Sequence, residues 1–583
     1  MERVKAWAVR WARPLLNWEV AAYVFLAVVA LGMHLWALDA RAFQYDETLH
    51  AFYSWKLYTG ESYQHSPMMH GPFQFYGTAA LFHLFGDSDV TARLLPALFG
   101  TALVALPYLL RRQMGRWGAM AAAVLLAFSP TLLYFGRFAR NDIYIVFWTL
   151  LLVVCLWRYI DEGKSRYLYI GAAALSLSFC TKEVSWITTG IIGLFLLIWA
   201  GRELVGRVRR RVDLKALSPP ADYLIVVGTL SLPLFAAFCQ LIPGVDIDGG
   251  AVWQKALVVG ILFAVSLAVG LRWDWRRWSI AAIIFYGIFC LFYSSFFSNV
   301  DGLASGIWGS VDYWLANRDA PRIVQPLFYY PMVLATYEFL PLLFGLVGGV
   351  YYAIKGDAFS RFLVYWAAMA LILQVWSGEN TAWLSVHIAL PLILLAAMFI
   401  GRALAGGWPG RWARVVPAAV VLALAVVFPF SVHVALQASY NVSDEPPQML
   451  VYAGMSHEMR QVVDQIEGLA ADSGKGTGLR ISVDNPLYWD WAWYIRDYDV
   501  QWLYATDLVP DGDVLLLAPE NEAAFEPHLG GYGEGQHFHE RIWFPEEYRD
   551  HGIGWWWRYF LSKETEGPYW SSESIVYVAQ GVP

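Results

Sequence analysis

Long apolar runs recur along this chain and constrain its fold more than any other feature. Stretches of about 18 or more mostly apolar residues are long enough to cross the hydrocarbon core of a bilayer as helices. The 583 residues are 58% hydrophobic and only 15% charged, whereas about half of a typical soluble protein is apolar. The sequence therefore predicts an all-α polytopic membrane protein.

Thirteen membrane spans are expected. They are 19–38, 88–110, 117–133, 143–160, 167–180, 184–200, 222–242, 253–271, 279–297, 333–354, 360–376, 383–404 and 413–436. The first run loosely resembles a signal peptide, but its apolar stretch is longer than a signal sequence needs. If the N-terminus is cytoplasmic, 24 Lys and Arg residues fall in the cytoplasmic arm and loops or at the span ends beside them, far more than face the outside. This positive-inside bias predicts a plasma-membrane protein with a cytoplasmic N-terminus and an extracytoplasmic C-terminus.

The composition changes after the last span. Residues 441–583 contain 24 Asp and Glu but only eight Lys and Arg. Short apolar runs at 480–483 and 514–517 alternate with a helix-like stretch at 489–496, a pattern typical of a small α/β domain. We therefore expect a membrane domain over 1–440, whose first outer loop is 39–87, and an extracytoplasmic domain over 441–583. The tryptophans at 555–557 could stack on sugar rings, lie at the lipid interface or pack against the membrane domain, and packing is the favoured use.

An acidic pair, Asp46 and Glu47, lies where the first span should leave the membrane. Carboxylates at such a position are costly to place and often have a chemical role. One of them could act as a general base toward an acceptor hydroxyl or hold a divalent ion. The alternative is a solvated helix cap or loop pair.

The remaining outer loops add cations, histidines and further carboxylates on the same side. Such a group of cations and carboxylates suits a substrate with a lipid-borne phosphate, because the cations can hold the phosphate while a carboxylate deprotonates the attacking hydroxyl. The arginines could instead bind lipid headgroups. Lys182 could instead form a self-neutralising pair with Glu183. A metal site with Asp46 also stays open, although no compact ligand spacing is present. The candidates are His50, His65, His70, Arg137, Arg140, Asp142, Lys182 and Glu379.

Several motifs give the chain a family resemblance. It resembles the GT-C glycosyltransferases, and within them the protein O-mannosyltransferases and the lipid A aminoarabinose transferases. The motifs are Tyr45-Asp46-Glu47, His70-Gly71-Pro72, Ala92-Arg93-Leu94-Leu95-Pro96, Ser129-Pro130 and Arg140-Asn141-Asp142. A second set is similar to a narrower branch of bacterial and archaeal membrane proteins named as flippase-activity-associated. That set comprises Tyr337-Glu338-Phe339, Gly378-Glu379-Asn380 with Trp383, and His387.

The resemblance implies thirteen helices and an inverting transfer from a polyprenyl-phosphate sugar donor to an extracytoplasmic lipid-linked glycan or protein. It implies that Asp46 is the general base and that Glu47 helps to place the acceptor. His70, Arg137, Arg140, Asp142 and Lys182 would contact the donor or its phosphate. A divalent metal, held by Asp46 and His70 if present, is the one possible cofactor. Membrane lipids are expected partners and nucleic acids are not. The alternative function is a non-enzymatic partner of lipid-linked sugar translocation.

Overall fold

A computed structural model of the chain describes residues 17–210, 214–242, 252–319, 325–378, 380–406, 408–441, 448–504, 508–544, 550–563 and 569–582. Contacts within the chain divide it into two compact units. The first unit comprises Met1–Trp36, Ser62–Gly77 and Leu94–Ser439, and the second comprises Ala37–Glu61, Thr78–Arg93 and Tyr440–Pro583. The first outer loop is therefore shared between the units, and most of it belongs with the C-terminal residues.

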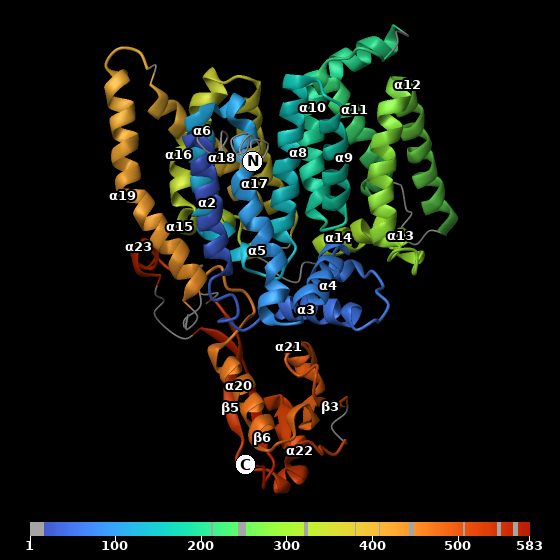
Figure 1. Cartoon of the computed structure of the whole chain (residues 1–583), viewed down its shortest axis with the longest axis vertical. Coiled ribbons are helices and arrows are strands. Elements are labelled where there is room, and N and C mark those ends of the chain that lie inside the picture. The colour runs from blue at the N-terminus through green and yellow to red at the C-terminus, as the bar shows by residue number, and fades with distance from the viewer. Residues whose placement is uncertain are drawn as a thin grey trace, which may run out of the picture. The chain divides into compact units, whose positions relative to one another are not determined.

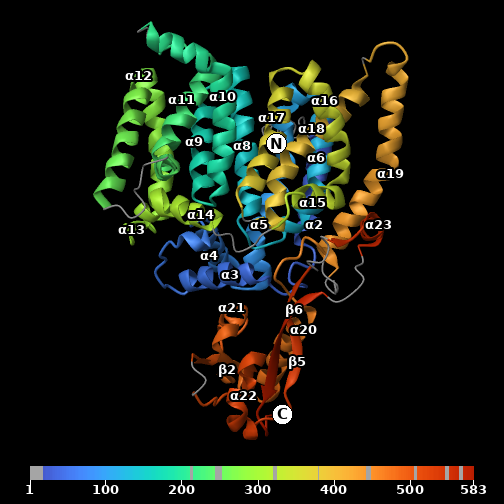
Figure 2. The same cartoon turned by 180° about the vertical axis from the view of Figure 1, so that it is seen from behind.

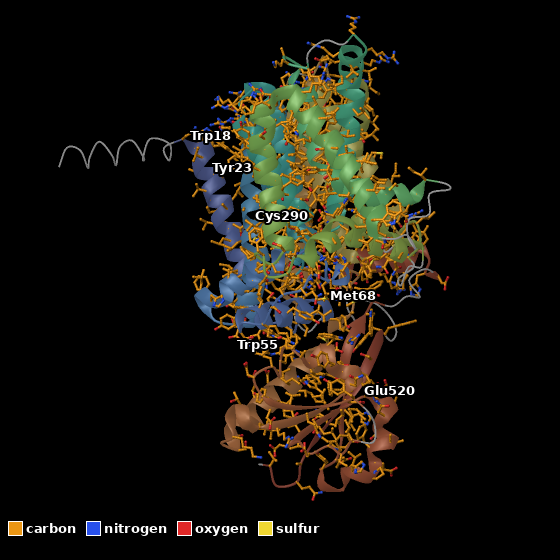
Figure 3. All side chains as sticks on the ribbon, turned by 90° about the vertical axis from the view of Figure 1, so that its right-hand side faces the viewer. Trp18, Tyr23, Trp55, Met68, Cys290 and Glu520 are labelled. Carbon is orange, nitrogen blue, oxygen red and sulfur yellow. The ribbon has the colours of Figure 1, made fainter. Side chains whose placement is uncertain are left out.

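The first unit is helical, and its long helices run side by side (Figures 1 and 2). Side chains fill the spaces between these helices, with Tyr23 on α2 and Cys290 on α12 (Figure 3). The helices are α2 (Trp18–Leu35), α6 (Arg111–Ala127), α7 (Pro130–Gly136), α8 (Asp142–Glu162), α9 (Arg166–Phe179), α10 (Val184–Arg209), α11 (Pro219–Ser231), α12 (Val252–Tyr293), α13 (Asp301–Ala304), α14 (Ser310–Asp319), α15 (Tyr329–Tyr337), α16 (Phe339–Lys355), α17 (Ala358–Trp376), α18 (Ser385–Ala405) and α19 (Trp412–Tyr440). Two further helices, α4 (Phe73–Phe85) and α5 (Asp89–Ala105), begin in one unit and end in the other.

The described residues contain nine helical stretches long and apolar enough to cross a membrane, or ten if the bent pair α15 and α16 forms one span. This confirms an integral membrane protein, while the count of thirteen spans stays a prediction. Two of the nine stretches each contain two expected spans. The backbone leaves the helical region at Gly115 within one and at Asp274 within the other. Phe263 and Tyr286 are in ring contact at 5.5 Å across the second break, so α12 folds back on itself. The expected span at 167–180 corresponds to α9, which has only 14 residues.

The core of the first unit is α18. Its whole apolar window is buried, and it packs against α6, α16 and α17. Gly401 on α18 lies so close to α6 that an added Cβ would be 2.2 Å from the backbone nitrogen of Gly118. Small residues of this kind let membrane helices approach closely and gain packing energy. This packing holds α18 in the core of the unit, and His387 lies near the opposite, N-terminal end of the helix.

The second unit combines the first-loop helix α3 (Tyr45–Tyr58) with a six-stranded sheet. The strand order is β1-β5-β6-β4-β2-β3, in which β2 pairs in parallel with β3 and β4 and the other pairs are antiparallel. The elements are β1 (Gly454–Met455), α20 (His457–Asp472), β2 (Arg480–Asp484), α21 (Tyr488–Trp491), β3 (Asp499–Leu503), β4 (Val514–Leu517), α22 (Glu522–Phe525), β5 (Gln536–Trp543), α23 (Ile553–Ser562) and β6 (Trp570–Val578). The two expected strands lie in β2 and β4, which confirms the α/β domain.

The helix expected at 489–496 is wrong in its length. Only Tyr488–Trp491 is α-helical, and turns follow. Trp491, Trp493 and Ile495 are all buried, and this spacing of two residues does not place side chains on one face of a helix. Trp491 instead packs in the core around α20, and Trp493 packs against α3 and α4 in a separate cluster.

Candidate active site

A buried charged cluster lies where three helices of the first unit begin. Asp142 is the first residue of α8, and its two carboxylate oxygens accept hydrogen bonds of 2.8 and 2.9 Å from Lys182 Nζ, just before α10. His387 Nε2 in α18 lies 3.1 Å from the same carboxylate. Arg140 Nε lies 3.4 Å from it, and the guanidinium stacks 3.6 Å from the ring centre of Trp383. The structure thus brings together four residues singled out from the sequence, Arg140, Asp142, Lys182 and His387.

A second pair connects this cluster to the first outer loop. His70 Nδ1 lies 2.7 Å from Glu183 Oε2, and Glu183 directly follows Lys182. Burial by itself would raise the pKa of Glu183, but His70, a backbone N–H group and Lys182 together hold the pKa below its usual value. The loop is fixed by a hydrogen bond of 3.0 Å from the Gly71 N–H to the Thr181 carbonyl oxygen. Any Cβ at Gly71 would clash with the Cys180 carbonyl at 2.2 Å, so only glycine allows this approach.

The cluster favours an anion. Arg140 and Lys182 carry two positive charges against the carboxylate of Asp142, and the neighbouring carboxylate of Glu183 is paired with His70. The N-terminal ends of α8, α10 and α18 also meet here, and each contributes a partial positive charge of about half an elementary charge. Arginine and lysine at helix N-termini are suited to holding a phosphate.

Glu338 fixes the segment that leads into the cluster. This fully buried residue lies between α15 and α16, and its Oε1 accepts hydrogen bonds from the Thr131 N–H and hydroxyl at 3.0 and 2.6 Å and from the Ser129 hydroxyl at 2.5 Å. These residues form the start of α7, which is followed directly by Arg137, Arg140 and Asp142. Glu338 therefore anchors the chain just before the charged cluster.

The acidic pair of the first loop belongs to the second unit, in the first turn of α3. Gln44 and Glu47 form a capping box, in which each side chain accepts a hydrogen bond from the backbone of this first turn. Glu47 is fully buried and pairs with the guanidinium of Arg93. Asp46 is partly exposed. The surroundings of the two carboxylates therefore differ, since Glu47 is buried in an ion pair with Arg93 and Asp46 is partly exposed.

Residues of the C-terminal domain hold the start of α3 in place. The Phe43 N–H donates to the Tyr494 hydroxyl at 2.7 Å, and Gln44 Nε2 donates to the Tyr452 carbonyl oxygen at 3.0 Å. The Arg541 guanidinium stacks 4.3 Å from the ring centre of Tyr45. The residue before Asp46 thus contacts β5, so the acidic turn and the C-terminal domain form one packed body within this unit.

The other candidates have more ordinary surroundings. Arg137 Nη1 donates to the carbonyl oxygens of Met33, His34 and Trp36, at the C-terminal end of α2. His50 Nδ1 lies 2.6 Å from the backbone oxygen of Asp46, one helical turn earlier. Burial lowers the pKa of His65 to about 4, which keeps this side chain neutral near pH 7. Glu379 lies outside the described residues.

Sequence reasoning did not assign site roles to Arg93, Trp383 or Glu338. All three lie within the motifs quoted above, so their membership of those motifs was the available signal. Among the described residues, no group of three or more His, Cys, Asp or Glu could hold a metal ion. Asp46 and His70 belong to different units, and His70 contacts Glu183. A divalent metal held by Asp46 and His70 therefore stays a prediction.

Comparisons with known proteins agree with this architecture. Residues 69–210 match the family model of the dolichyl-phosphate-mannose-protein mannosyltransferases. No curated protein sequence matches the chain. The structure is similar to ArnT from Cupriavidus metallidurans bound to undecaprenyl phosphate, with a TM-score of 0.52, 14% identity, and coverage of 96% of this chain and 98% of that one.

It is also similar to the oligosaccharyltransferase AglB from Archaeoglobus fulgidus, solved with an inhibitory peptide and a dolichol-phosphate. The TM-score is 0.51, the identity is 14%, and the match covers 83% of this chain. This chain spans only 64% of the length of that enzyme. A second structure of the Archaeoglobus enzyme, with a TM-score of 0.51, is a complex with zinc and sulfate. At these identities the likeness shows a shared fold.

Proposed function

We propose that this protein is a GT-C glycosyltransferase that takes a sugar from a polyprenyl-phosphate carrier and transfers it to an extracytoplasmic acceptor. The acceptor is a lipid-linked glycan or a surface protein. The observation that carries the proposal is the buried cluster of Arg140, Asp142 and Lys182 at the meeting point of three helix N-termini. Buried ions at membrane depth are costly, and an anionic ligand offsets that cost.

In this mechanism the first-unit cluster holds the carrier phosphate. Lys182 exchanges part of its contact with Asp142 for a phosphate oxygen, and Arg140 donates to the phosphate while its guanidinium stays stacked on Trp383. Charge-assisted hydrogen bonds of this kind strengthen as negative charge develops on the leaving phosphate. Asp142 orients both cations, and His387 holds the Asp142 carboxylate in place.

Asp46 is the proposed general base. It removes the proton from the acceptor hydroxyl as the acceptor oxygen attacks the anomeric carbon from the face opposite the phosphate, which inverts that centre. Glu47 lies beside it but is paired with Arg93, so its role is to fix the first turn of α3. The protein has its N-terminus in the cytoplasm and its C-terminal domain outside, which keeps the base on the side where no nucleotide sugar is available.

Transfer assays test the proposal directly. The full chain in lipid nanodiscs is incubated with undecaprenyl-phosphate mannose, glucose or galactose in which the sugar is radiolabelled. Membranes from a strain that lacks this protein supply the acceptor. The proposal expects label to move from the lipid carrier to a membrane acceptor with at least one donor. Tight binding of undecaprenyl phosphate with no transfer from any donor would instead favour the non-enzymatic role in sugar translocation.

A further inference from the structure

Helix α23 carries an exposed apolar stripe that the proposed reaction does not use. Ile553, Trp557 and Leu561 are 89%, 62% and 52% exposed. They are spaced four residues apart, which puts them on one face of the helix. On the described part of the C-terminal domain, no other helix carries three exposed large apolar side chains.

The opposite face fastens α23 to the domain. Tyr559 is 1% exposed, and its hydroxyl accepts a hydrogen bond of 3.0 Å from the Met449 N–H. Its ring stacks on Trp555 at 5.4 Å and packs against Phe544 at 5.2 Å. The exposed stripe is therefore held rigidly outward, and it is not the inner face of a detached helix.

The chemistry of the stripe fits a lipid interface better than a sugar. Its three members are a tryptophan and two aliphatic side chains, and none of them offers a hydrogen bond to a ring hydroxyl except the indole N–H. Tryptophan prefers the boundary between headgroups and acyl chains. The helix carries one exposed cation, Arg558, although the domain as a whole carries 24 acidic and eight basic residues. Lys563, at the end of the helix, is buried and donates to the Phe560 carbonyl oxygen. A cation beside an apolar stripe is typical of helices that lie on anionic membranes.

The chain connection limits how far Met449, a contact of α23, can lie from the end of a candidate membrane span. The candidate span α19 ends at Tyr440, and Met449, which contacts Tyr559, follows nine residues later. A fully extended chain of this length reaches at most about 30 Å. We propose that α23 lies in the membrane interface and anchors the C-terminal domain through Ile553, Trp557 and Leu561. This anchoring goes beyond the proposed transfer reaction and does not depend on it.

Spin labels on the full chain test the anchoring. Cysteine replaces Ile553, Trp557 or Leu561, one at a time, in a chain whose Cys155, Cys180, Cys239 and Cys290 are changed to alanine. The protein is reconstituted into vesicles of phosphatidylethanolamine and phosphatidylglycerol. The collision rates of each label with oxygen, which concentrates in lipid, and with a water-soluble nickel chelate are then measured. Glu534→Cys, at an exposed position of the same domain, provides the aqueous control.

The proposal expects all three stripe labels to collide several-fold more often with oxygen, relative to the nickel chelate, than the label at position 534. Equal accessibility to the nickel chelate at the stripe and at the control would place the stripe in water and overturn the proposal. Labels that are immobilised and reached by neither reagent would show that the stripe packs against protein, which also overturns it.

Discussion

The Arg93 guanidinium donates two parallel hydrogen bonds to the Glu47 carboxylate: Nε lies 2.8 Å from Oε1 and Nη2 lies 2.8 Å from Oε2. Both side chains are almost fully buried. The same guanidinium donates to the carbonyl oxygens of the chain just before α3, those of Leu38, Arg41 and Ala42. The pair therefore shapes the entry to the helix that carries Asp46.

Glu47→Gln should destabilise the protein strongly. Removing one partner of a buried ion pair leaves the other charge uncompensated and typically costs about 3–5 kcal/mol. Thermal unfolding of the purified protein measures this. Glu61→Gln is the matched control, because Glu61 pairs with Lys56 at the surface and exposed pairs contribute about 0–1 kcal/mol. Equal stability of the two variants would contradict a structural role for Glu47.

The three arginine and lysine candidates should separate into two classes. Arg140→Ala and Lys182→Ala should each weaken the binding of undecaprenyl phosphate about tenfold or more, since a charge-assisted hydrogen bond is worth about 1.5–3 kcal/mol. Arg137→Ala should instead lower thermal stability and leave the affinity of the folded protein for undecaprenyl phosphate unchanged. The reason is that Arg137 Nη1 donates to backbone carbonyl oxygens at the C-terminal end of α2. Titration of the lipid into each variant in nanodiscs measures the affinities. A loss of affinity in Arg137→Ala alone would reverse the assignment.

The start of α3 should depend on the C-terminal domain. Tyr494→Phe removes the acceptor of the Phe43 N–H, and an unpaired buried donor costs about 1–3 kcal/mol. Because Asp46 follows within one turn, we expect a lower turnover number with unchanged affinity for undecaprenyl phosphate. Tyr504→Phe, at a side chain that is 66% exposed, should behave as wild type. Unchanged turnover in Tyr494→Phe would show that the contact serves assembly and not the position of Asp46.

The sequence correctly predicted a helical integral membrane protein because long apolar runs leave few alternatives to helices in a bilayer. It also selected Arg140, Asp142, Lys182 and His387, which the structure brings together. Their mutual contacts could not be predicted, since His387 is 245 residues from Asp142 along the chain. The packing of α18 against α8, together with its packing against α6 and α16, brings the N-terminal ends of α8 and α18 together.

Two features lay beyond sequence reasoning. Asp46 and Glu47 look equivalent as neighbours, but a partner 46 residues away, Arg93, distinguishes them. The first loop also follows a membrane span, which suggests that it belongs to the membrane domain. Its residues 37–61 and 78–93 instead pack with the C-terminal residues, because Phe43 stacks on Trp493 and Trp493 stacks on Phe82. Such long-range aromatic packing leaves no periodic signal.

The pH dependence of the C-terminal domain should reflect Glu540. This carboxyl is buried and accepts a hydrogen bond from Trp491 Nε1 at 3.0 Å. Burial, with the nearby Asp490, raises its pKa to about 8, against about 4.3 in an unfolded chain. The folded state therefore favours the protonated form of Glu540. The stability that this protonation contributes is fully present below about pH 4.3 and is lost as the pH rises toward 8.

Glu540→Gln should keep the acceptor for Trp491 and remove this titration. We expect its melting temperature to exceed that of wild type more at pH 8 than at pH 5. Glu534→Gln, at an exposed residue of the same domain, is the control and should follow wild type at both values. A wild-type domain that gains stability between pH 5 and pH 8, relative to Glu540→Gln, would contradict the raised pKa.

The turnover of Asp46→Asn tests the central claim most directly. The variant is compared with Asp39→Asn, which changes an exposed carboxylate in the same loop, using the donor that supports transfer by the wild type. A positioned general base contributes about 10²–10⁴-fold to the rate. We therefore predict that Asp46→Asn loses transfer by about this factor, while its binding of undecaprenyl phosphate and its melting temperature match those of Asp39→Asn. Turnover by Asp46→Asn close to that of wild type would remove Asp46 from the chemistry and contradict the proposed mechanism.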